Sequence, residues 1–339
     1  MTVASLGKWV GAGRAWVRAL VLMAACSGPA HAAWGVSFEY AGLPPQTQSF
    51  EDSLSSNIGS ALGLWTRHLA GDAAIEIEVV FTDGIERAMA HSLTSGLVRN
   101  DGPLRVYEQG VAYEIRTGTD PNGGAPDLRL LLNPDYLHSE LWFDPEPALR
   151  STPVPADKTD AVSVFAHELG HALAFNGWWD TGPDGLRPDY GSTWDLNTEY
   201  IGSFLFFTGA RAASLYGGPV PVTAGNNWHI GNAADPGADL LGDLMNGVAF
   251  DRGTRYGVSA LDLAMLADMG ITLAPVPEPQ TGLLMAAGLA ALAGCRRGRR
   301  REQRCAPTIR RLRSAPRKSV ACCTSTTPKT AASASAWSR

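Results

Sequence analysis

Hydrophobic residues recur along the first half of the chain with two different periods. Over residues 50–70 they return mostly every three or four positions, which predicts an amphipathic helix; the apolar positions are Leu54, Ile58, Leu62 and Leu69. Isoleucine and valine alternate with glutamate over residues 75–81, which predicts a strand, and residues 108–115 and 128–132 are further candidate strands. Residues 120–127 (DPNGGAPD) have the composition of a turn. The carboxylates of this turn could hold calcium, although their spacing matches no calcium-binding loop.

Residues 160–177 (DAVSVFAHELGHALAFNG) carry the clearest helical pattern of the chain. Asp160 suits the N-cap position, and Asn176-Gly177 would end the helix. The apolar stripe that faces the core in this prediction consists of Val162, Phe165, Leu169 and Leu173.

The second half of the chain is expected to consist mainly of loops. Residues 181–192 and 216–227 are rich in glycine and proline, which is typical of long loops. A last helix is predicted over residues 259–269, with Ser259 as N-cap and Gly270 just beyond its end. Helices and strands in this irregular order, followed by a loop-rich C-terminal half, predict an α+β fold.

The net charge of −5 conceals three differently charged segments. Residues 1–32 carry +3, residues 33–273 carry −19 and residues 274–339 carry +11. Affinity for nucleic acid comes from clustered lysine and arginine. The acidic segment 33–273, called the body below, therefore argues against a nucleic-acid partner. The chain is 45% hydrophobic, and its body is long enough to bury a core of its own.

Cysteine is absent from residues 33–294. The body can therefore form neither disulfides nor a cysteine–metal site, so a metal there would be held by histidine and carboxylate. A propeptide that blocks a metal through a cysteine is excluded on the same ground. The cysteines of the chain are Cys26, Cys295, Cys305, Cys322 and Cys323.

The first 32 residues have the organisation of a secretory signal peptide. Lys8, Arg14 and Arg18 form a positive n-region, residues 19–25 are apolar, and Ala30-His31-Ala32 offers a small-residue cleavage site. This pattern predicts an exported protein.

A second targeting signal is predicted over residues 274–301, directly after the body. Val276-Pro277-Glu278-Pro279 precedes a run of small apolar residues, 282–294, and then an arginine cluster formed by Arg296, Arg297, Arg299, Arg300 and Arg301. This order of parts resembles a PEP-CTERM sorting signal, which implies a bacterial surface protein handled by a membrane exosortase. As a helix the apolar run would span about 20 Å, short for a hydrocarbon core of about 30 Å. The arginines predict that the chain beyond it faces the cytoplasm and the body lies outside.

Residues 302–339 are basic and rich in serine, threonine and alanine, a composition that cannot supply a core and predicts disorder. The predicted organisation is a signal peptide (1–32), a globular domain (33–273), a sorting signal with a short transmembrane segment (274–301) and a basic tail (302–339).

Candidate chemistry concentrates on the central helix, where His167, Glu168 and His171 form a His-Glu-x-x-His motif. Residues four apart lie on one face of a helix, so both imidazoles can bind one Zn²⁺ ion. Glu168 lies beside them and can take a proton from a water on the metal as that water attacks a carbonyl. The alternative is a pair of solvated histidines on an ordinary helix.

A catalytic zinc ion needs a third protein ligand and one open position. His229 is the one histidine after this helix, and it follows a glycine-rich segment, so it is the favoured third ligand. Glu199 competes with it, because some enzymes with this motif use a downstream glutamate. An ordinary loop histidine is the other interpretation of His229. The upstream histidines, which no pattern brings near the site, are His68, His91 and His138.

The motif with a distant third histidine is similar to the zinc site of the metzincin peptidases, and of the leishmanolysin branch in particular. In that branch a turn with a methionine follows the third histidine, and here Asp243-Leu244-Met245 follows His229. The resemblance covers about residues 162–270 and implies that Met245 packs beneath the zinc ion without binding it. It also implies a mixed, twisted sheet ahead of the active-site helix.

The chain departs from the metzincin pattern at two positions. The usual glycine three residues after the second histidine is Ala174, and Gly177 stands where compact metzincins place their third histidine. The second departure agrees with a distant ligand, and Asn176-Gly177 would supply the bend that the missing glycine normally allows. Tyr256 resembles a tyrosine that assists zinc in some metzincins; the alternative is a surface aromatic residue.

Together these residues predict an exported zinc endopeptidase that acts on proteins or peptides, with His167, His171 and His229 as zinc ligands and Glu168 as general base. The alternative is a non-enzymatic surface or matrix-binding protein on a zinc-stiffened fold, although binding alone has no need of Glu168. A third hypothesis is hydrolysis of a non-peptide amide at the same zinc ion.

Overall fold

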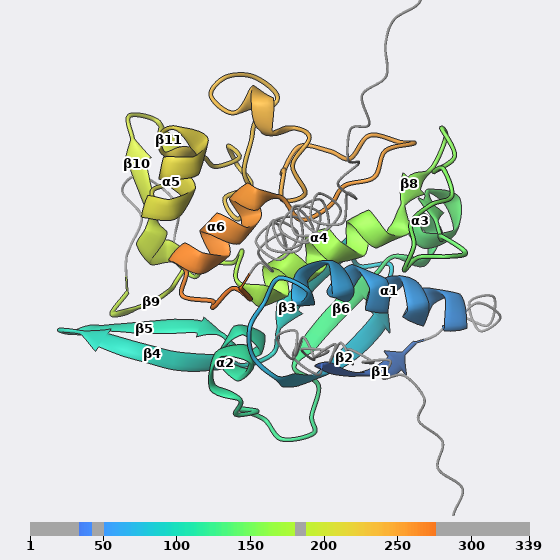
Figure 1. The fold of residues 1–339 in the computed structure, drawn as a ribbon, viewed down its shortest axis with the longest axis horizontal. Helices are drawn as coiled ribbons and strands as arrows, with labels where there is room; N and C mark the ends of the chain where they lie inside the picture. Colours follow the sequence, from blue (N-terminus) through green and yellow to red (C-terminus); the bar gives the residue numbers. More distant parts are fainter. Residues whose placement is uncertain (1–33, 43–50, 180–187, 276–339) are drawn as a thin grey trace, which may run out of the picture. The chain divides into compact units, whose positions relative to one another are not determined.

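The computed structural model describes residues 34–42, 51–179 and 188–275 (Figure 1). Within these ranges helices and strands alternate irregularly, which confirms the α+β prediction. The α-helices are α1 (Glu51–Thr66), α2 (Gly110–Thr117), α3 (Pro134–Ser139), α4 (Ala161–Leu173), α5 (Ala210–Tyr216) and α6 (Ala260–Asp268), and two short 3₁₀ helices are η2 (Asp195–Asn197) and η3 (Ala238–Leu240).

The described strands form one main sheet and three smaller ones. In order across the main sheet they are β1 (Trp34–Ala41), β2 (Ala73–Phe81), β6 (Leu128–Leu132) and β3 (Ala88–Ser92). The smaller sheets are β4 (Ser95–Asp101), β5 (Leu104–Gln109) and β9 (Tyr190–Ser192); β10 (Thr198–Ile201), β11 (Phe204–Phe207) and β12 (Val220–Pro221); and β7 (Leu141–Trp142) with β8 (Thr159–Asp160).

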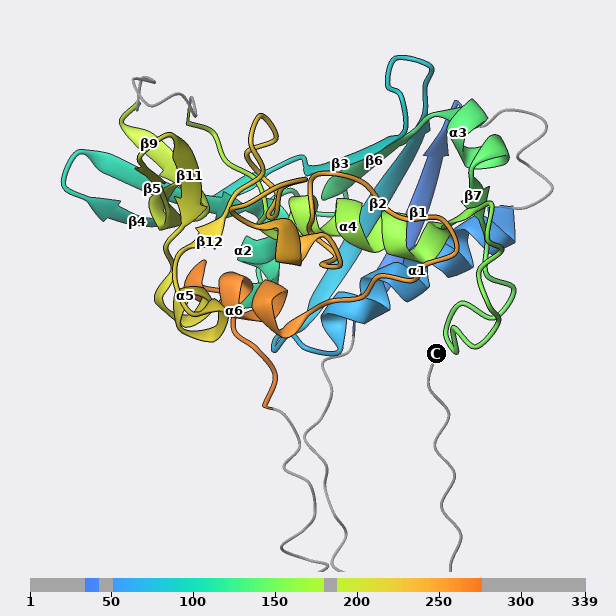
Figure 2. The same cartoon turned by 90° about the horizontal axis from the view of Figure 1, so that it is seen from above.

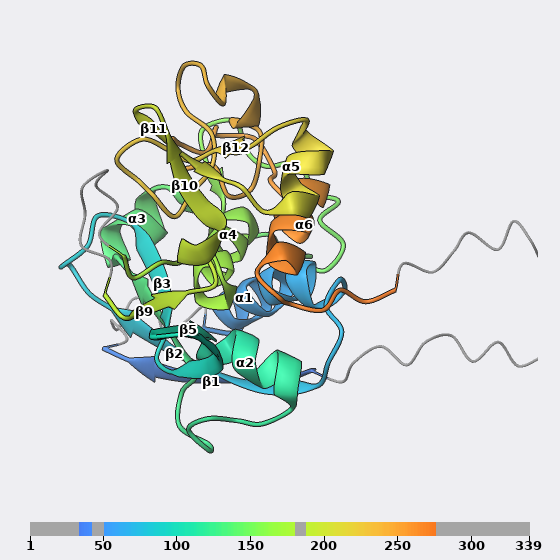
Figure 3. The ribbon, with the colours of Figure 1, turned by 90° about the vertical axis from the view of Figure 1, so that its left-hand side faces the viewer.

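The main sheet is mixed, because β1, β2 and β6 run parallel while β3 pairs antiparallel with β6 at the edge. Along β2, Ile75, Ile77 and Val79 are fully buried, and Glu76 and Glu78 between them are partly exposed. This alternation confirms the predicted strand and gives the sheet one strongly apolar face. Helices α1 and α4 cover one face of the sheet and contact each other (Figures 2 and 3).

The two central helices form because their apolar positions match the helical period. Helix α1 ends at Thr66, four residues before the predicted end, and Leu69 instead forms an isolated bridge with Leu273. Trp65 at the end of α1 donates from its indole Nε1 to the Ala166 carbonyl on α4 at 2.8 Å. The predicted stripes are all buried: Leu54, Ile58 and Leu62 on α1, and Val162, Phe165, Leu169 and Leu173 on α4.

The strand predicted over residues 108–115 is wrong beyond Gln109, because α2 begins at Gly110. Val111 and Ile115 are four residues apart and both buried, which suits a helix better than a strand. Gly118 then ends the helix in the left-handed conformation at φ 67°. The apolar residues within 108–115 fit both the strand period and the helical period, and tertiary packing selects the helix.

The C-terminal half contains more regular structure than its composition predicts. Within the predicted loop 216–227 lies β12, and β9 occupies the end of the predicted loop 181–192, of which residues 181–187 lie outside the described ranges. These strands have two or three residues, too few for a sequence pattern to show. The last helix is confirmed, since Ser259 accepts from the Asp262 backbone N–H at 2.9 Å and Gly270 has φ 99°.

The predicted signal peptide, the C-terminal apolar segment and the basic tail lie outside the described residues. In the ranges that are described, every helix is too short or too polar to cross a bilayer.

Candidate metal centre

Three histidines from two distant parts of the chain converge at one point. His167 and His171 come from α4, and His229 comes from the loop between β12 and η3. Their Nε2 atoms form a triangle with sides of 3.3 Å (167 to 171), 3.0 Å (171 to 229) and 3.0 Å (167 to 229). A tetrahedral zinc ion with Zn–N bonds of about 2.0–2.1 Å needs nitrogens roughly 3.3 Å apart. The triangle therefore has the size of a zinc site.

Each imidazole is oriented through its other ring nitrogen, which donates to a backbone carbonyl. The pairs are His167 Nδ1 with Leu244 (2.6 Å), His171 Nδ1 with Phe175 (2.7 Å) and His229 Nδ1 with Asn226 (3.3 Å). With the proton on Nδ1, every Nε2 presents a lone pair to the other two. Three lone pairs this close repel one another unless a cation lies among them, so the donor set fits a metal.

The surroundings keep these imidazoles neutral. Burial lowers the pKa of His167 to about 3, helped by the neighbouring His171, and burial lowers the pKa of His171 to about 4. The pKa of His229 is lowered for the same reasons, burial first and the other two rings second. A metal binds the unprotonated ring, so the site is ready for an ion well below neutral pH.

Glu168 points from α4 toward the edge strand of the main sheet. Its Oε2 accepts a hydrogen bond from the Ala90 backbone N–H on β3 at 3.1 Å. The side chain is partly exposed and lines the same cleft as His167 and His229. Burial raises the pKa of Glu168 to about 8, against the opposing effect of the Ala90 N–H. A carboxyl of this pKa can hold and release a proton near neutral pH.

The raised pKa makes a testable contribution to stability in the metal-free protein. Glu168 titrates near 8 in the folded chain and near its ordinary 4.5 when unfolded. Between pH 4.5 and 8 the unfolded chain loses this proton while the folded chain keeps it, so the free energy of unfolding falls as the pH rises. Glu168→Gln should remove this loss of unfolding free energy, which amounts to at most about 1.4 kcal/mol for each pH unit in the range. Denaturant unfolding of both proteins should give a stability difference that grows in favour of the variant across this range. A difference independent of pH would contradict the shift.

Met245 packs against helix α4, which carries His167 and His171. It is fully buried, and a Cβ added to Gly170 would lie 2.6 Å from its sulfur, so the methionine packs directly against the backbone of α4. The Met245 carbonyl accepts from the Ile230 backbone N–H at 3.0 Å, next to His229. Its neighbour Leu244 orients His167. The methionine turn thus joins α4 to the loop of the third histidine.

Met245→Ala is expected to destabilise the protein by about 2–5 kcal/mol, because it opens a cavity beneath α4. Met245→Leu conserves the volume and should cost less than about 1.5 kcal/mol. Urea unfolding of both variants measures the difference. Equal stabilities for alanine and leucine at this position would contradict the packing described above.

The two departures from the metzincin pattern have local explanations. Helix α4 ends at Leu173, so the predicted end at Asn176-Gly177 is wrong, and Ala174 has φ −166°, which any residue adopts. A glycine is therefore not needed at that position. Gly177 is required for another reason: a Cβ there would lie 2.3 Å from an Asp195 carboxylate oxygen. Asp195 in turn accepts from the Trp178 backbone N–H at 2.9 Å.

The remaining candidate residues do not line the cleft beside the histidines. Glu199 is exposed on β10 and is not part of the group of potential ligands. Tyr256 is 4% exposed, so the surface alternative is wrong. Its hydroxyl accepts from the Asp251 backbone N–H at 3.0 Å, and its ring stacks on Phe250 at 4.2 Å. The upstream histidines also lie outside the group: His68, His91 and His138.

The cleft beside the histidines has a volume of about 170 Å³, room for several waters at roughly 30 Å³ each. The Phe250 ring meets the His167 ring edge-on at 5.3 Å. Burial raises the pKa of Tyr136 to about 12. The residues that line the cleft include Arg87, Ala88, Tyr136, Val164, Asn226 and Phe250. No sequence pattern predicts them, because only the fold brings them together.

Comparison with known proteins identifies the sorting signal near the C-terminus. Residues 275–300 match the PEP-CTERM protein-sorting motif, which confirms the predicted sorting signal. The motif indicates export with surface- or membrane-associated sorting, and it implies handling by exosortase machinery. No curated protein matches the chain.

Proposed function

We propose that this chain is an exported zinc-dependent endopeptidase with a metzincin-like site of the leishmanolysin type. The observation that carries the proposal is the convergence of three unprotonated Nε2 atoms next to a cleft that His167, His229 and Glu168 line. His167, His171 and His229 would hold the ion, and three protein ligands leave one position open for chemistry. When bound, zinc would polarise the scissile carbonyl and acidify a water molecule.

Glu168 has the properties of the general base. It adjoins His167 on α4 and faces the cleft, so it can accept a proton from the attacking water and deliver it to the leaving amine. The Ala90 N–H bond to its Oε2 holds the carboxyl in place at the edge of the cleft. Burial raises the pKa of Glu168 in the metal-free protein, and a zinc ion beside it would favour the carboxylate that a general base needs.

An extended polypeptide is the substrate that suits this cleft. Strand β3 is the edge of the main sheet, and Ala88 at its start lines the cleft together with Arg87. An edge strand can add one more strand through main-chain hydrogen bonds, which recognises peptides of many sequences. The Ala90 N–H is already bonded to Glu168, so the peptide would pair with the part of β3 that starts at Ala88. The ring of Phe250 offers an apolar contact for one substrate side chain.

The test is digestion of unfolded casein by the purified full chain. Cleavage should stop when zinc is removed by a chelator and return when zinc is added back. Zinc binding without cleavage of casein or of peptides would favour the non-enzymatic binding protein. Hydrolysis of small acyl amides in place of casein would favour the non-peptide amidase.

A further inference from the structure

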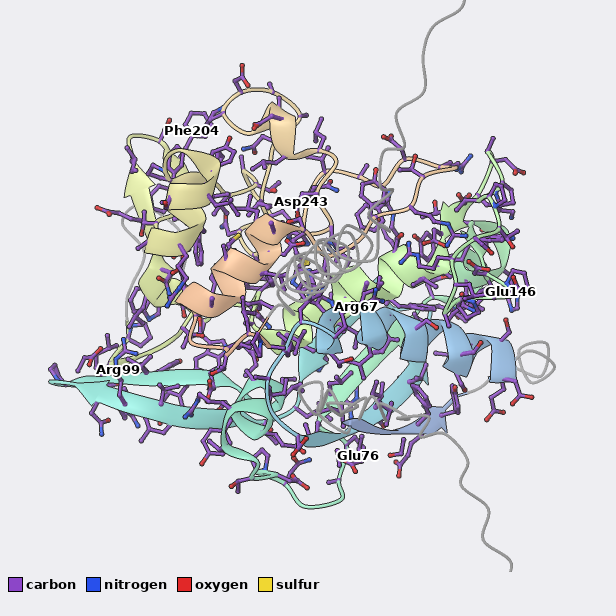
Figure 4. The ribbon with its side chains drawn as sticks, in the orientation of Figure 1. Arg67, Glu76, Arg99, Glu146, Phe204 and Asp243 are labelled. Carbon is purple, nitrogen blue, oxygen red and sulfur yellow. The ribbon has the colours of Figure 1, made fainter. Side chains whose placement is uncertain are left out.

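Four carboxylates meet where α2 and the loop after it return to the main sheet. They belong to Glu76 on β2, Glu114 on α2, and Asp120 and Asp127 in the loop. Oxygens of Glu114, Asp120 and Asp127 lie within 4.8 Å of one another. The Glu76 backbone N–H donates to Asp127 Oδ2 at 2.9 Å, and Figure 4 shows Glu76 on β2 beside this loop. The cluster is separate from the three histidines.

Buried carboxylate oxygens in this cluster have no hydrogen-bond partner. Asp127 is fully buried and Glu114 is 3% exposed. One oxygen of each accepts from a backbone N–H, Asp127 Oδ2 from Glu76 and Glu114 Oε1 from Ala74 at 2.8 Å. The other oxygens, Asp127 Oδ1 and Glu114 Oε2, are buried without a donor, as is Glu76 Oε2. Unpaired buried charge is strongly unfavourable, so such oxygens are neutralised either by a proton shared between carboxyls or by a cation.

Among the described residues, no ion pair involves these four acids. The arginines on the neighbouring elements bond elsewhere, Arg116 to Glu108 and Arg129 to Glu78. Burial raises the pKa of Asp127 to about 7, with Glu76 and Glu114 adding to the effect. The pKa of Glu114 is raised by burial and then by Asp120 and Glu76. The negative charges act on one another because nothing positive lies among them in the described part of the chain.

We propose that Glu76, Glu114, Asp120 and Asp127 bind one calcium ion. Calcium takes six to eight oxygen ligands in flexible geometry, whereas zinc prefers nitrogen and sulfur and magnesium keeps most of its waters. The loop presents one more unpartnered buried oxygen, Asn122 Oδ1, as a neutral ligand. Bound calcium would fasten α2 and the loop to β2. Extracellular media supply calcium at the concentrations that such sites require, in keeping with export.

The test is calcium titration of the purified full chain with one equivalent of zinc present. Calorimetry should detect one site with a Kd of about 10⁻⁵–10⁻³ M. Calcium at 100 times this Kd should raise Tm by about 5–10 °C, and magnesium by less. Absence of both calcium heat and a Tm shift would overturn the proposal.

Isosteric variants locate the site. Asp127→Asn removes one charge but can still accept from Glu76, and it should weaken calcium binding at least tenfold. Asp120→Asn tests the same ion from a partly exposed position, where folding is least at risk. Asp83→Asn alters an exposed acid outside the cluster and should respond to calcium like the wild type. Wild-type calcium affinity in both cluster variants would overturn the assignment.

Discussion

Glu168→Gln is expected to lower kcat for peptide cleavage by about 10²–10⁴-fold while zinc stays bound. Glutamine has the same shape as glutamate but cannot accept a proton from water. Its amide oxygen can still accept from the Ala90 N–H, so the local structure should persist. The three imidazoles and their carbonyl partners are untouched by the change. The loss should therefore lie in kcat, with little change in metal content.

Cleavage of a fluorogenic peptide, together with metal analysis of the same sample, measures both quantities. Glu199→Gln is the matched control, because Glu199 is an exposed glutamate on β10 outside the cleft. It should cleave at the wild-type rate. A Glu168→Gln enzyme with a kcat within threefold of the wild type would remove Glu168 from the chemistry.

His229→Ala is expected to weaken zinc binding by more than the 10–100-fold that loss of an outer hydrogen-bond partner costs. The variant keeps only the two imidazoles of α4, which cannot complete a three-ligand site. The loop should remain folded, since it is also held by the Ile230 N–H bond to the Met245 carbonyl and by the bond from Gly231 N–H to Pro221. Cleavage should disappear at zinc concentrations that saturate the wild type.

Competition with a chromophoric chelator gives the zinc affinity of each protein. Glu199→Ala should retain wild-type affinity, because its side chain lies outside the histidine group. Loss of zinc in Glu199→Ala with retention in His229→Ala would reverse the choice of third ligand.

The helix and its two histidines were predictable because their positions follow from local rules. A four-residue spacing on a helix places His167 and His171 on one face whatever the rest of the fold does. Asp160 caps α4 as predicted, accepting from the Ser163 backbone N–H at 3.1 Å. His229 is the one histidine downstream of this helix, which makes it the expected third ligand ahead of Glu199, and the fold brings its Nε2 beside the other two.

Features that depend on packing were not readable in the sequence. Backbone carbonyls orient the imidazoles, and because every residue type has one, the sequence does not reveal which of them do so. The end of α4 at Leu173 depends on tertiary contacts of the residues that follow it. The run from 108 to 115 has an ambiguous period, so α2 was mistaken for a strand. The four-carboxylate cluster draws ligands from β2, α2 and a loop, a combination that no linear spacing shows.

X-ray absorption at the zinc edge of the zinc-loaded full chain tests the central claim most directly. Three imidazole nitrogens and one oxygen from solvent are expected around the metal at about 2.0–2.1 Å. Failure of the chain to retain zinc, or a zinc ion surrounded by fewer than three imidazoles, would contradict the triangle of His167, His171 and His229 as a metal centre.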